Sequence, residues 1–238
     1  MSIQLINNKL GRLAAGLVLG GSLLATSANA FDLEEGGYAG TDNQGHATVV
    51  WNFLHHFTYE QYYYSASHMW TWNNDTRVDN MDFAIFAGHG APWYFTGQDG
   101  VGVNMKYVGD GADGGYGDRD LEFVAFQSCA VVPSPLESDD WAFHWTRVSG
   151  VFEGLHQALG FRNSSYQSTD QDVTETFGNY VKNGYNVWGS WLASISLEAM
   201  DKEKGCVVFH PTCTNDTRTN FAPDPPQGST WMHCWYML

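Results

Sequence analysis

Two short apolar stretches decide the fold of this chain: MDFAIFAGHG at residues 81–90 and LEFVAFQSC at residues 121–129. Each run is too short for a typical helix, is rich in aromatic and aliphatic residues, and stops abruptly at glycine or polar residues. Such runs are typical of strands that are buried on both faces, as in a parallel sheet. We therefore expect buried parallel strands over 81–87 and over 121–126.

Several segments outside these strands have the periodicity of helices. Residues 173–183 place Phe177, Tyr180 and Val181 on one face, and Gly184 then provides a common helix-ending residue. Strands that alternate with helices predict an α/β fold, with helices flanking a mostly parallel central sheet. The other expected elements are a helix, or a strand followed by a helix, over 48–64, a helix over 139–148, a helix feeding a short strand over 151–161, a last helix over 188–200, and loops over 31–46 and 97–120.

The first thirty residues have the pattern of a secretory signal peptide. Lys9 and Arg12 supply positive charge, residues 13–24 are apolar, and Ala-Asn-Ala at 28–30 is a small-x-small cleavage pattern. An uncleaved N-terminal anchor is the alternative. We expect cleavage before Phe31, a secreted or periplasmic location, and no membrane span in the mature chain.

The composition limits the partners that the protein can have. The chain carries 26 acidic residues against 11 Lys and Arg residues, which gives a formal net charge of −15. Nucleic-acid binding needs clustered basic side chains, so we expect no nucleic-acid partner. Aromatic residues make up 15% of the chain, which offers enough apolar surface for a folded core. We expect one compact domain over 31–238.

Three of the four cysteines, Cys206, Cys213 and Cys234, lie in the tail over 200–238. In an oxidising compartment this crowding predicts one disulfide among the three. Histidines in the same tail leave a Cys/His metal site as the alternative, although the spacing matches no pattern of paired zinc ligands.

The remaining cysteine, Cys129, follows the second strand just as His89 follows the first. The carboxyl ends of neighbouring parallel strands meet at one edge of a sheet, where functional groups of such folds gather. An imidazole within reach of a thiol favours the reactive thiolate. The backbone N–H groups of Gly90 and Cys129 then form a candidate oxyanion hole, in which each donor contributes about 2.7–4 kcal/mol in known enzymes.

The two blocks around these residues resemble the His-Gly and strand–Cys blocks of caspase-like cysteine peptidases, the clan of caspases, gingipains, clostripain and CHAT domains. FAGHG at 86–90 precedes FVAFQSC at 123–129, in the order of the clan, and Gln-Ser-Cys is similar to the Gln-Ala-Cys of caspases. Segments within 151–193 resemble those that follow the nucleophile in bacterial members. The resemblance covers roughly residues 80–200 and implies a caspase-like three-layer sandwich.

The resemblance also implies an activity, the hydrolysis of peptide bonds in a peptide or protein substrate through a thioester acyl-enzyme. By position, Cys129 is the nucleophile and His89 the general acid that protonates the leaving amine, with the N–H groups of Gly90 and Cys129 holding the oxyanion. The alternative is a catalytically silent relative that acts as a binding or surface protein. Candidates for the residue that selects the substrate side chain are Asp99, Asp139, Asp140, Asp170 and Asp172, or Arg147 and Arg162.

We expect no cofactor for this chemistry, and calcium is the one ion that the sequence suggests. Asp110, Asp113, Asp118 and Asp120 supply hard oxygen ligands within a Gly-rich stretch. Their spacing departs from the EF-hand pattern, because position 112 is alanine. A solvated loop without an ion is the default interpretation.

Overall fold

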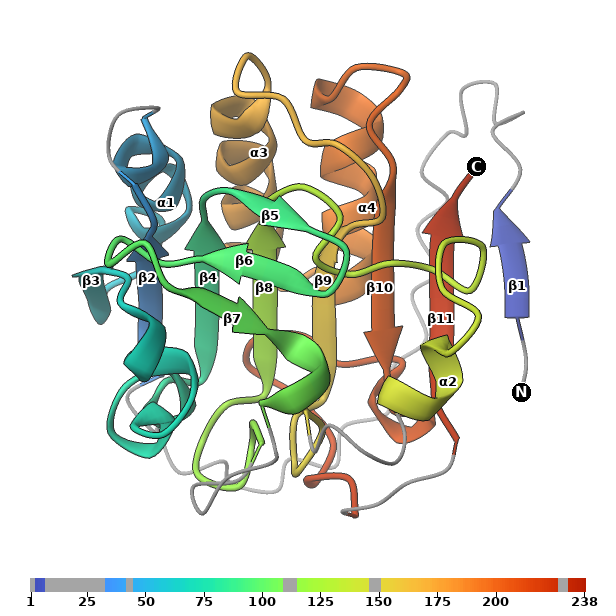
Figure 1. Cartoon of the computed structure of the whole chain (residues 1–238), viewed down its shortest axis with the longest axis horizontal. Coiled ribbons are helices and arrows are strands. Elements are labelled where there is room, and N and C mark those ends of the chain that lie inside the picture. The colour runs from blue at the N-terminus through green and yellow to red at the C-terminus, as the bar shows by residue number, and fades with distance from the viewer. Residues whose placement is uncertain (1–2, 7–32, 42–44, 109–114, 146–150, 227–230) are drawn as a thin grey trace.

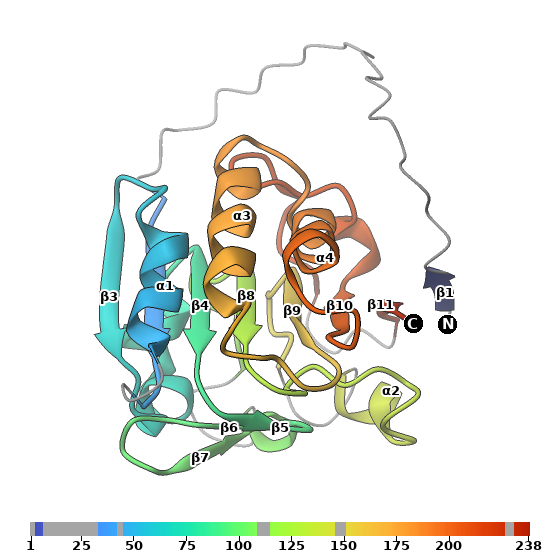
Figure 2. The ribbon, with the colours of Figure 1, turned by 90° about the horizontal axis from the view of Figure 1, so that it is seen from above.

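A computed structural model gives the structure of the chain. It describes residues 3–6, 33–41, 45–108, 115–145, 151–226 and 231–238. The fold is α/β with three layers: a central sheet, three long helices over one face, and a small second sheet with short helices over the other (Figures 1 and 2). The α/β class and the mostly parallel central sheet are as the sequence predicts. Long helices, however, cover only one of the two faces.

The central sheet is parallel over most of its width. Five consecutive neighbours run in one direction, and the next strand along the sheet runs in the opposite direction to both of its partners. In sheet order the strands are β1 (Ile3–Ile6), β11 (His233–Met237), β10 (Gly205–Phe209), β9 (Gln157–Phe161), β8 (Phe123–Gln127), β4 (Phe83–Ala87), β2 (Glu35–Ala39) and β3 (Glu60–Tyr64).

The two stretches that predict the fold form β4 and β8, which are parallel neighbours at the centre of the sheet. Every residue of both strands is buried. Phe83 and Phe123 lie in the core beneath the long helices, whereas Phe86 and Phe126 lie in the core on the opposite face. Burial on both faces explains why these strands read as continuous apolar runs.

The helical face is built from α1 (His46–Leu54), α3 (Asp170–Lys182) and α4 (Val187–Glu198) (Figure 2). Phe177 of α3 contacts Phe53 of α1 and Trp191 of α4, with ring centroids 5.4 and 5.0 Å apart. The two helices predicted over 173–183 and 188–200 are therefore confirmed. Gly184 follows α3 with φ +77°, the left-handed conformation that favours glycine at a helix end.

The opposite face is covered by a three-stranded antiparallel sheet of β5 (Gly90–Ala91), β6 (Tyr94–Thr96) and β7 (Gly102–Asn104). Short 3₁₀ turns and the single-turn α2 (Trp141–Phe143) complete this layer. Trp70 is fully buried there and meets the rings of Phe86 and Phe95 edge-on. Aromatic packing thus fixes the second sheet onto the first.

Five sequence predictions were wrong in detail. The expected loop over 97–120 contains the short strand β7 and a 3₁₀ turn over Met105–Tyr107. The expected loop over 31–46 contains the buried strand β2, and the segment 48–64 belongs to a helix followed by a strand rather than the reverse order. The helix expected over 139–148 is limited to one turn among its described residues, and the segment 151–161 holds a strand without a preceding helix.

Glycine content caused the error over β2. At Gly37 a Cβ atom would lie 2.2 Å from Cγ1 of Val50, so a side chain there would collide with α1. Glycine in this strand permits close helix–sheet packing, whereas glycine in sequence normally indicates a loop.

The N-terminal strand β1 falls within the predicted signal peptide, and residues 7–32 lie outside the described part of the chain. Among the described residues β1 pairs only with β11, and β1 is itself the edge strand of the sheet. Signal-peptide cleavage stays a prediction, and it would leave a seven-stranded sheet ending at β11. Among the described residues, no helix is long and apolar enough to cross a membrane.

Candidate active site

His89 and Cys129 lie at the carboxyl edge of the central sheet, each two residues beyond its strand. β4 and β8 pair in register up to Ala87 and Gln127, and His89 and Cys129 each follow two residues later. The expectation that the two strands are parallel neighbours is confirmed. The two side chains therefore start from adjacent positions on one edge of the molecule, the upper edge in Figure 1.

The two turns that carry these residues are bonded to each other. Gly88 N–H donates to the Gln127 carbonyl at 3.3 Å, and Ser128 Oγ donates to the Gly88 carbonyl at 2.9 Å. A Cβ atom at Gly90 would lie 2.4 Å from Ser128 Oγ and 2.6 Å from the Cys129 carbonyl oxygen. Only glycine lets the chain after His89 pass this close to Cys129.

The backbone immediately after Cys129 adopts an unusual conformation. Ala130 has φ +57°, which lies in the left-handed region that alanine rarely occupies. Its N–H donates to the Asn163 carbonyl at 2.8 Å, a bond that holds the chain in this bend. Such backbone strain often accompanies functional sites, because the surrounding structure must maintain it.

Cys129 is half-buried and contacts the loop after β9. Ser165 N–H donates to Cys129 Sγ at 3.4 Å, and the thiol donates to the Ser165 carbonyl at 3.5 Å. His89 is exposed to solvent. The sulfur is thus held in place from one side, while the imidazole is accessible.

A second histidine lies beside His89. The rings of His46 and His89 are perpendicular, with centroids 5.5 Å apart. His46 is only 5% exposed, and its Nδ1 lies 2.5 Å from the Thr41 carbonyl oxygen. Since a carbonyl can only accept, Nδ1 of His46 carries the hydrogen. Sequence reasoning missed His46 because it follows β2, the strand that was interpreted as a loop.

A buried carboxylate, Asp170 at the start of α3, connects the residues behind the sulfur. Asp170 Oδ1 accepts hydrogen bonds from Gln127 Nε2 at 2.7 Å and from Ser165 Oγ at 2.6 Å. Burial raises the pKa of Asp170, while these two bonds and the nearby His46 lower it. Asp170, a candidate for substrate selection, is therefore buried and hydrogen-bonded to residues that support the site.

An acidic hollow of about 770 Å³ lies between the segments that follow the two strands. Lys106 Nζ bonds Asp140 at 2.8 Å, and this bond holds the pKa of Asp140 well below its usual range. Asp139 and Glu137 also line the hollow. The residues around it are Pro92, Trp93, Asn104, Lys106 and Tyr107 after His89, and Glu137, Ser138, Asp139 and Asp140 after Cys129.

The other candidates for substrate selection lie elsewhere. Asp99 accepts hydrogen bonds from Ser67, Asp172 is exposed on α3, and Arg162 pairs with Glu137. Arg147 lies outside the described residues.

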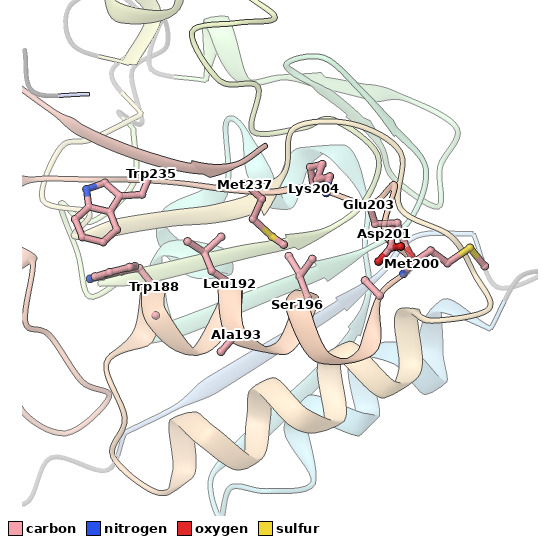
Figure 3. A pocket seen from close by; sticks show the side chains of 13 residues that line it. Trp188, Leu192, Ala193, Ser196, Met200, Asp201, Glu203, Lys204, Trp235 and Met237 are labelled. Carbon is pink, nitrogen blue, oxygen red and sulfur yellow. Dashed lines mark hydrogen bonds between the residues drawn. The ribbon is translucent and has the colours of Figure 1, made fainter. Parts of the chain in front are cut away.

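A groove of about 670 Å³ runs between α4 and β11, on the helical face of the sheet (Figure 3). Trp188, Leu192, Trp235 and Met237 give it an apolar floor, and Asp201, Glu203 and Lys204 give it one polar end. No thiol or imidazole is among the residues that line it.

The tail cysteines are divided between two places. Cys206 and Cys234 are buried on neighbouring strands with their sulfur atoms 3.6 Å apart. Cys213 instead groups with His156 and Asp216. All four thiols are free in the structure, so a tail disulfide stays a prediction, and the geometry favours the Cys206–Cys234 pair.

The calcium candidates do not form one loop site within the described chain. Asp118 groups with Asp75 and Asp79, whereas Asp120 groups with Asp82 and Glu122. The two remaining candidates, Asp110 and Asp113, lie outside the described residues.

The fold and the edge residues define an α/β protein with a thiol and an imidazole on adjacent strands. The chain belongs to the family described as domain of unknown function DUF6345, whose model matches residues 23–222. No curated protein matches the chain.

Proposed function

We propose that the protein is a cysteine peptidase in which Cys129 is the nucleophile and His89 the general acid. The observation that carries the proposal is the matched position of the two residues, each two steps beyond paired strands, with Gly90 against the Cys129 carbonyl. Acyl transfer through sulfur requires at least a thiol and an imidazole, and here the two residues follow the ends of adjacent strands.

The reaction would proceed in two steps. The Cys129 thiolate attacks the scissile carbonyl carbon, and the backbone N–H groups of Gly90 and Cys129 bind the resulting oxyanion. The C–N bond then breaks as His89 gives its proton to the leaving amine, which leaves a thioester on sulfur. Water hydrolyses the thioester, releases the carboxylic acid product and restores the thiol.

The charge of the hollow between the segments that follow the two strands suggests a substrate class. Lys106 pairs with Asp140 and Arg162 pairs with Glu137, so Asp139 adds one negative charge to the lining that neither pair balances. A positively charged side chain next to the scissile bond would be attracted there. We expect cleavage after Lys or Arg in preference to Asp or Glu.

One contact favours the second candidate, a catalytically silent scaffold that binds a partner. The thiol of Cys129 donates to the Ser165 carbonyl at 3.5 Å, which is a bond of the neutral form of cysteine. If that form persists at neutral pH, the sulfur is a poor nucleophile.

Alkylation by iodoacetamide near neutral pH separates the two functions. The peptidase requires rapid labelling of Cys129, slowed at least about tenfold in His89→Ala because the imidazole no longer favours the thiolate. The three buried cysteines are the internal control, since they should stay unlabelled until the protein unfolds. Labelling of Cys129 at the rate of an ordinary thiol, unchanged in His89→Ala, contradicts the peptidase.

Cleavage of a peptide library by the wild type, but not by Cys129→Ser, is the second requirement. The Ser variant keeps the size of the side chain, so a folded but inactive variant supports a direct chemical role for the sulfur.

A further inference from the structure

A row of ionisable residues precedes the strands at the edge opposite Cys129. Each of three strands is preceded directly by an ionisable residue: β4 by Asp82, β8 by Glu122 and β9 by His156. Glu122 N–H donates to the Asp82 carbonyl at 3.1 Å, and His156 N–H donates to the Glu122 carbonyl at 2.9 Å. Residues in register on neighbouring parallel strands project on the same side of the sheet. The carboxylates of Asp82 and Glu122 thus start side by side, whereas the imidazole of His156 groups with Cys213 and Asp216.

A third carboxylate completes a cluster. Asp82, Asp120 and Glu122 each place one carboxylate oxygen within 4.8 Å of the others. Asp82 and Glu122 are both only 8% exposed, so water solvates their charges poorly. Three like charges this close, two of them buried, are unfavourable unless a proton or a cation neutralises them.

Glu122 is the member of the cluster whose charge is least compensated. Its Oε2 atom is buried and has no hydrogen-bond partner among the described residues. Burial, followed by the charges of Asp82 and Asp120, raises the pKa of Glu122 to about 9. A buried carboxylate oxygen without a donor is unfavourable, which points to a bound ligand as its partner.

The basic groups near the cluster are engaged with other partners. Arg218 lowers the pKa of Asp82, but its guanidinium bonds the buried Glu35. His156 Nδ1 lies 2.7 Å from Asp216 Oδ2 and its Nε2 lies 3.7 Å from Asp224 Oδ1, so this imidazole lies between two carboxylates outside the three-residue cluster. Asp224 raises the pKa of both Asp120 and Glu122, so it adds a fourth negative charge to the surroundings.

We propose that Asp82, Asp120 and Glu122 bind a calcium ion, with Asp224 as an adjacent carboxylate. The donors are all hard carboxylate oxygens, which suit Ca²⁺ and its six to eight oxygen ligands far better than they suit zinc. The ion would join the start of β4, the segment before β8 and the chain after β10. Its role is structural, since it lies at the opposite edge of the sheet from His89 and Cys129.

Thermal unfolding with and without calcium tests the site. After treatment with a chelator, millimolar calcium chloride should raise the Tm of the wild type, because the ion binds the folded state only. Glu122→Gln should weaken calcium binding at least about tenfold, measured by calorimetric titration, and should also raise the Tm of the metal-free protein. That opposite pair of effects follows from removing a buried carboxyl that is unfavourable in the metal-free protein, where it must take up a proton or carry a charge beside two other carboxylates, and that the ion compensates when bound.

Matched variants make the result interpretable. Asp120→Asn changes an exposed member of the cluster, so it should fold and still lose at least about tenfold in calcium affinity. Asp172→Asn makes the same chemical change on the exposed face of α3 and should bind calcium as the wild type does. Three results would each overturn the proposal: no calcium effect on the wild type, calcium binding by Glu122→Gln and Asp120→Asn as tight as that of the wild type, or tighter binding of zinc than of calcium.

Discussion

The imidazole rings of His46 and His89 meet at right angles, with centroids 5.5 Å apart, at the carboxyl edge of the sheet. His46 is buried and fixed by the bond from its Nδ1 to the Thr41 carbonyl, whereas His89 is exposed. An exposed imidazole that acts on a thiol must be held in position, and a buried ring beside it does so without taking part in the reaction. His46 is therefore a positioning residue in the proposed mechanism.

His46→Ala should slow the alkylation of Cys129 by about three- to tenfold, the effect of losing an aromatic contact of roughly 1 kcal/mol. The pH at which the alkylation rate is half-maximal should shift as well, because the His89 ring would lose the contact that the proposed mechanism uses to orient it. His55→Ala, which changes an exposed histidine at the end of α1, is the control and should leave both quantities unchanged. An unaltered pH profile in His46→Ala, with normal folding, would rule out the positioning role.

Gly90→Ala tests the close approach of the two turns. A methyl group there would lie 2.4 Å from Ser128 Oγ and 2.6 Å from the Cys129 carbonyl oxygen, so the chain must move away from Cys129. We expect a loss of about 1–3 kcal/mol in the free energy of unfolding, the usual cost of overpacking, and a loss of Cys129 reactivity. Gly189→Ala, in the first turn of α4, should leave the reactivity of Cys129 unchanged, because its methyl group would meet the side chain of Asn186, 3.2 Å from Oδ1.

Much of the central fold can be predicted from the sequence, because the strongest signals come from elements buried on both faces. β4 and β8 are apolar throughout, and that pattern has few alternatives. β2 was missed since Gly36 and Gly37 fill a strand that packs tightly against α1 and Met81, a reason that only the three-dimensional structure reveals.

The candidate site was predictable to the same extent. His89 and Cys129 follow strands that the sequence identifies, so their shared edge follows from topology alone. His46 follows β2, which the sequence predicts as a loop, and Ser165 follows β9, which it predicts only as a short strand after a helix. No local sequence pattern marks either residue as part of the site. The cluster of Asp82, Asp120 and Glu122 depends on strand register, which sequence periodicity does not give.

The pH dependence of stability should reveal the buried carboxyls in the metal-free protein. The pKa of Glu122 is raised from 4.5 to about 9 by burial and by Asp82 and Asp120, with Asp224 adding to the effect. A carboxyl with a raised pKa binds more protons in the folded state than in the unfolded state. The free energy of unfolding must therefore fall as the pH rises between these two values, with a limiting slope of about 1.4 kcal/mol per pH unit for one group.

Chemical denaturation of chelator-treated protein at a series of pH values measures this slope. Glu122→Gln should reduce it, and a residual slope should remain because burial also raises the pKa of Asp79 to about 8 and that of Glu35 to about 7. Calcium should restore the stability of the wild type most strongly at the alkaline end of the range. A wild-type stability that rises with pH across this range would contradict the assignment of buried, protonated carboxyls.

The cysteine pair of the last two strands gives a prediction about the oxidised protein. Cys206 and Cys234 have sulfur atoms 3.6 Å apart, so a small shift of both side chains brings them to bonding distance. Cys213 is held apart from them, and burial raises the pKa of its thiol to about 12, which keeps it protonated and unreactive. In protein exported to an oxidising compartment, non-reducing peptide mapping should find Cys206 joined to Cys234, with Cys129 and Cys213 free.

The bridge would close a loop of 28 positions, for which chain-entropy arguments give a gain of roughly 3–4 kcal/mol in the free energy of unfolding. Cys234→Ser should therefore be less stable than the oxidised wild type by about that amount, and both should behave alike under reducing conditions apart from the local effect of the substitution. Burial raises the pKa of Cys206 well above its ordinary value, which disfavours the thiolate needed for thiol–disulfide exchange in the folded protein. A bridge that includes Cys213 would require the segment after β10 to rearrange, and a bridge that includes Cys129 would remove the nucleophile and with it the proposed peptidase.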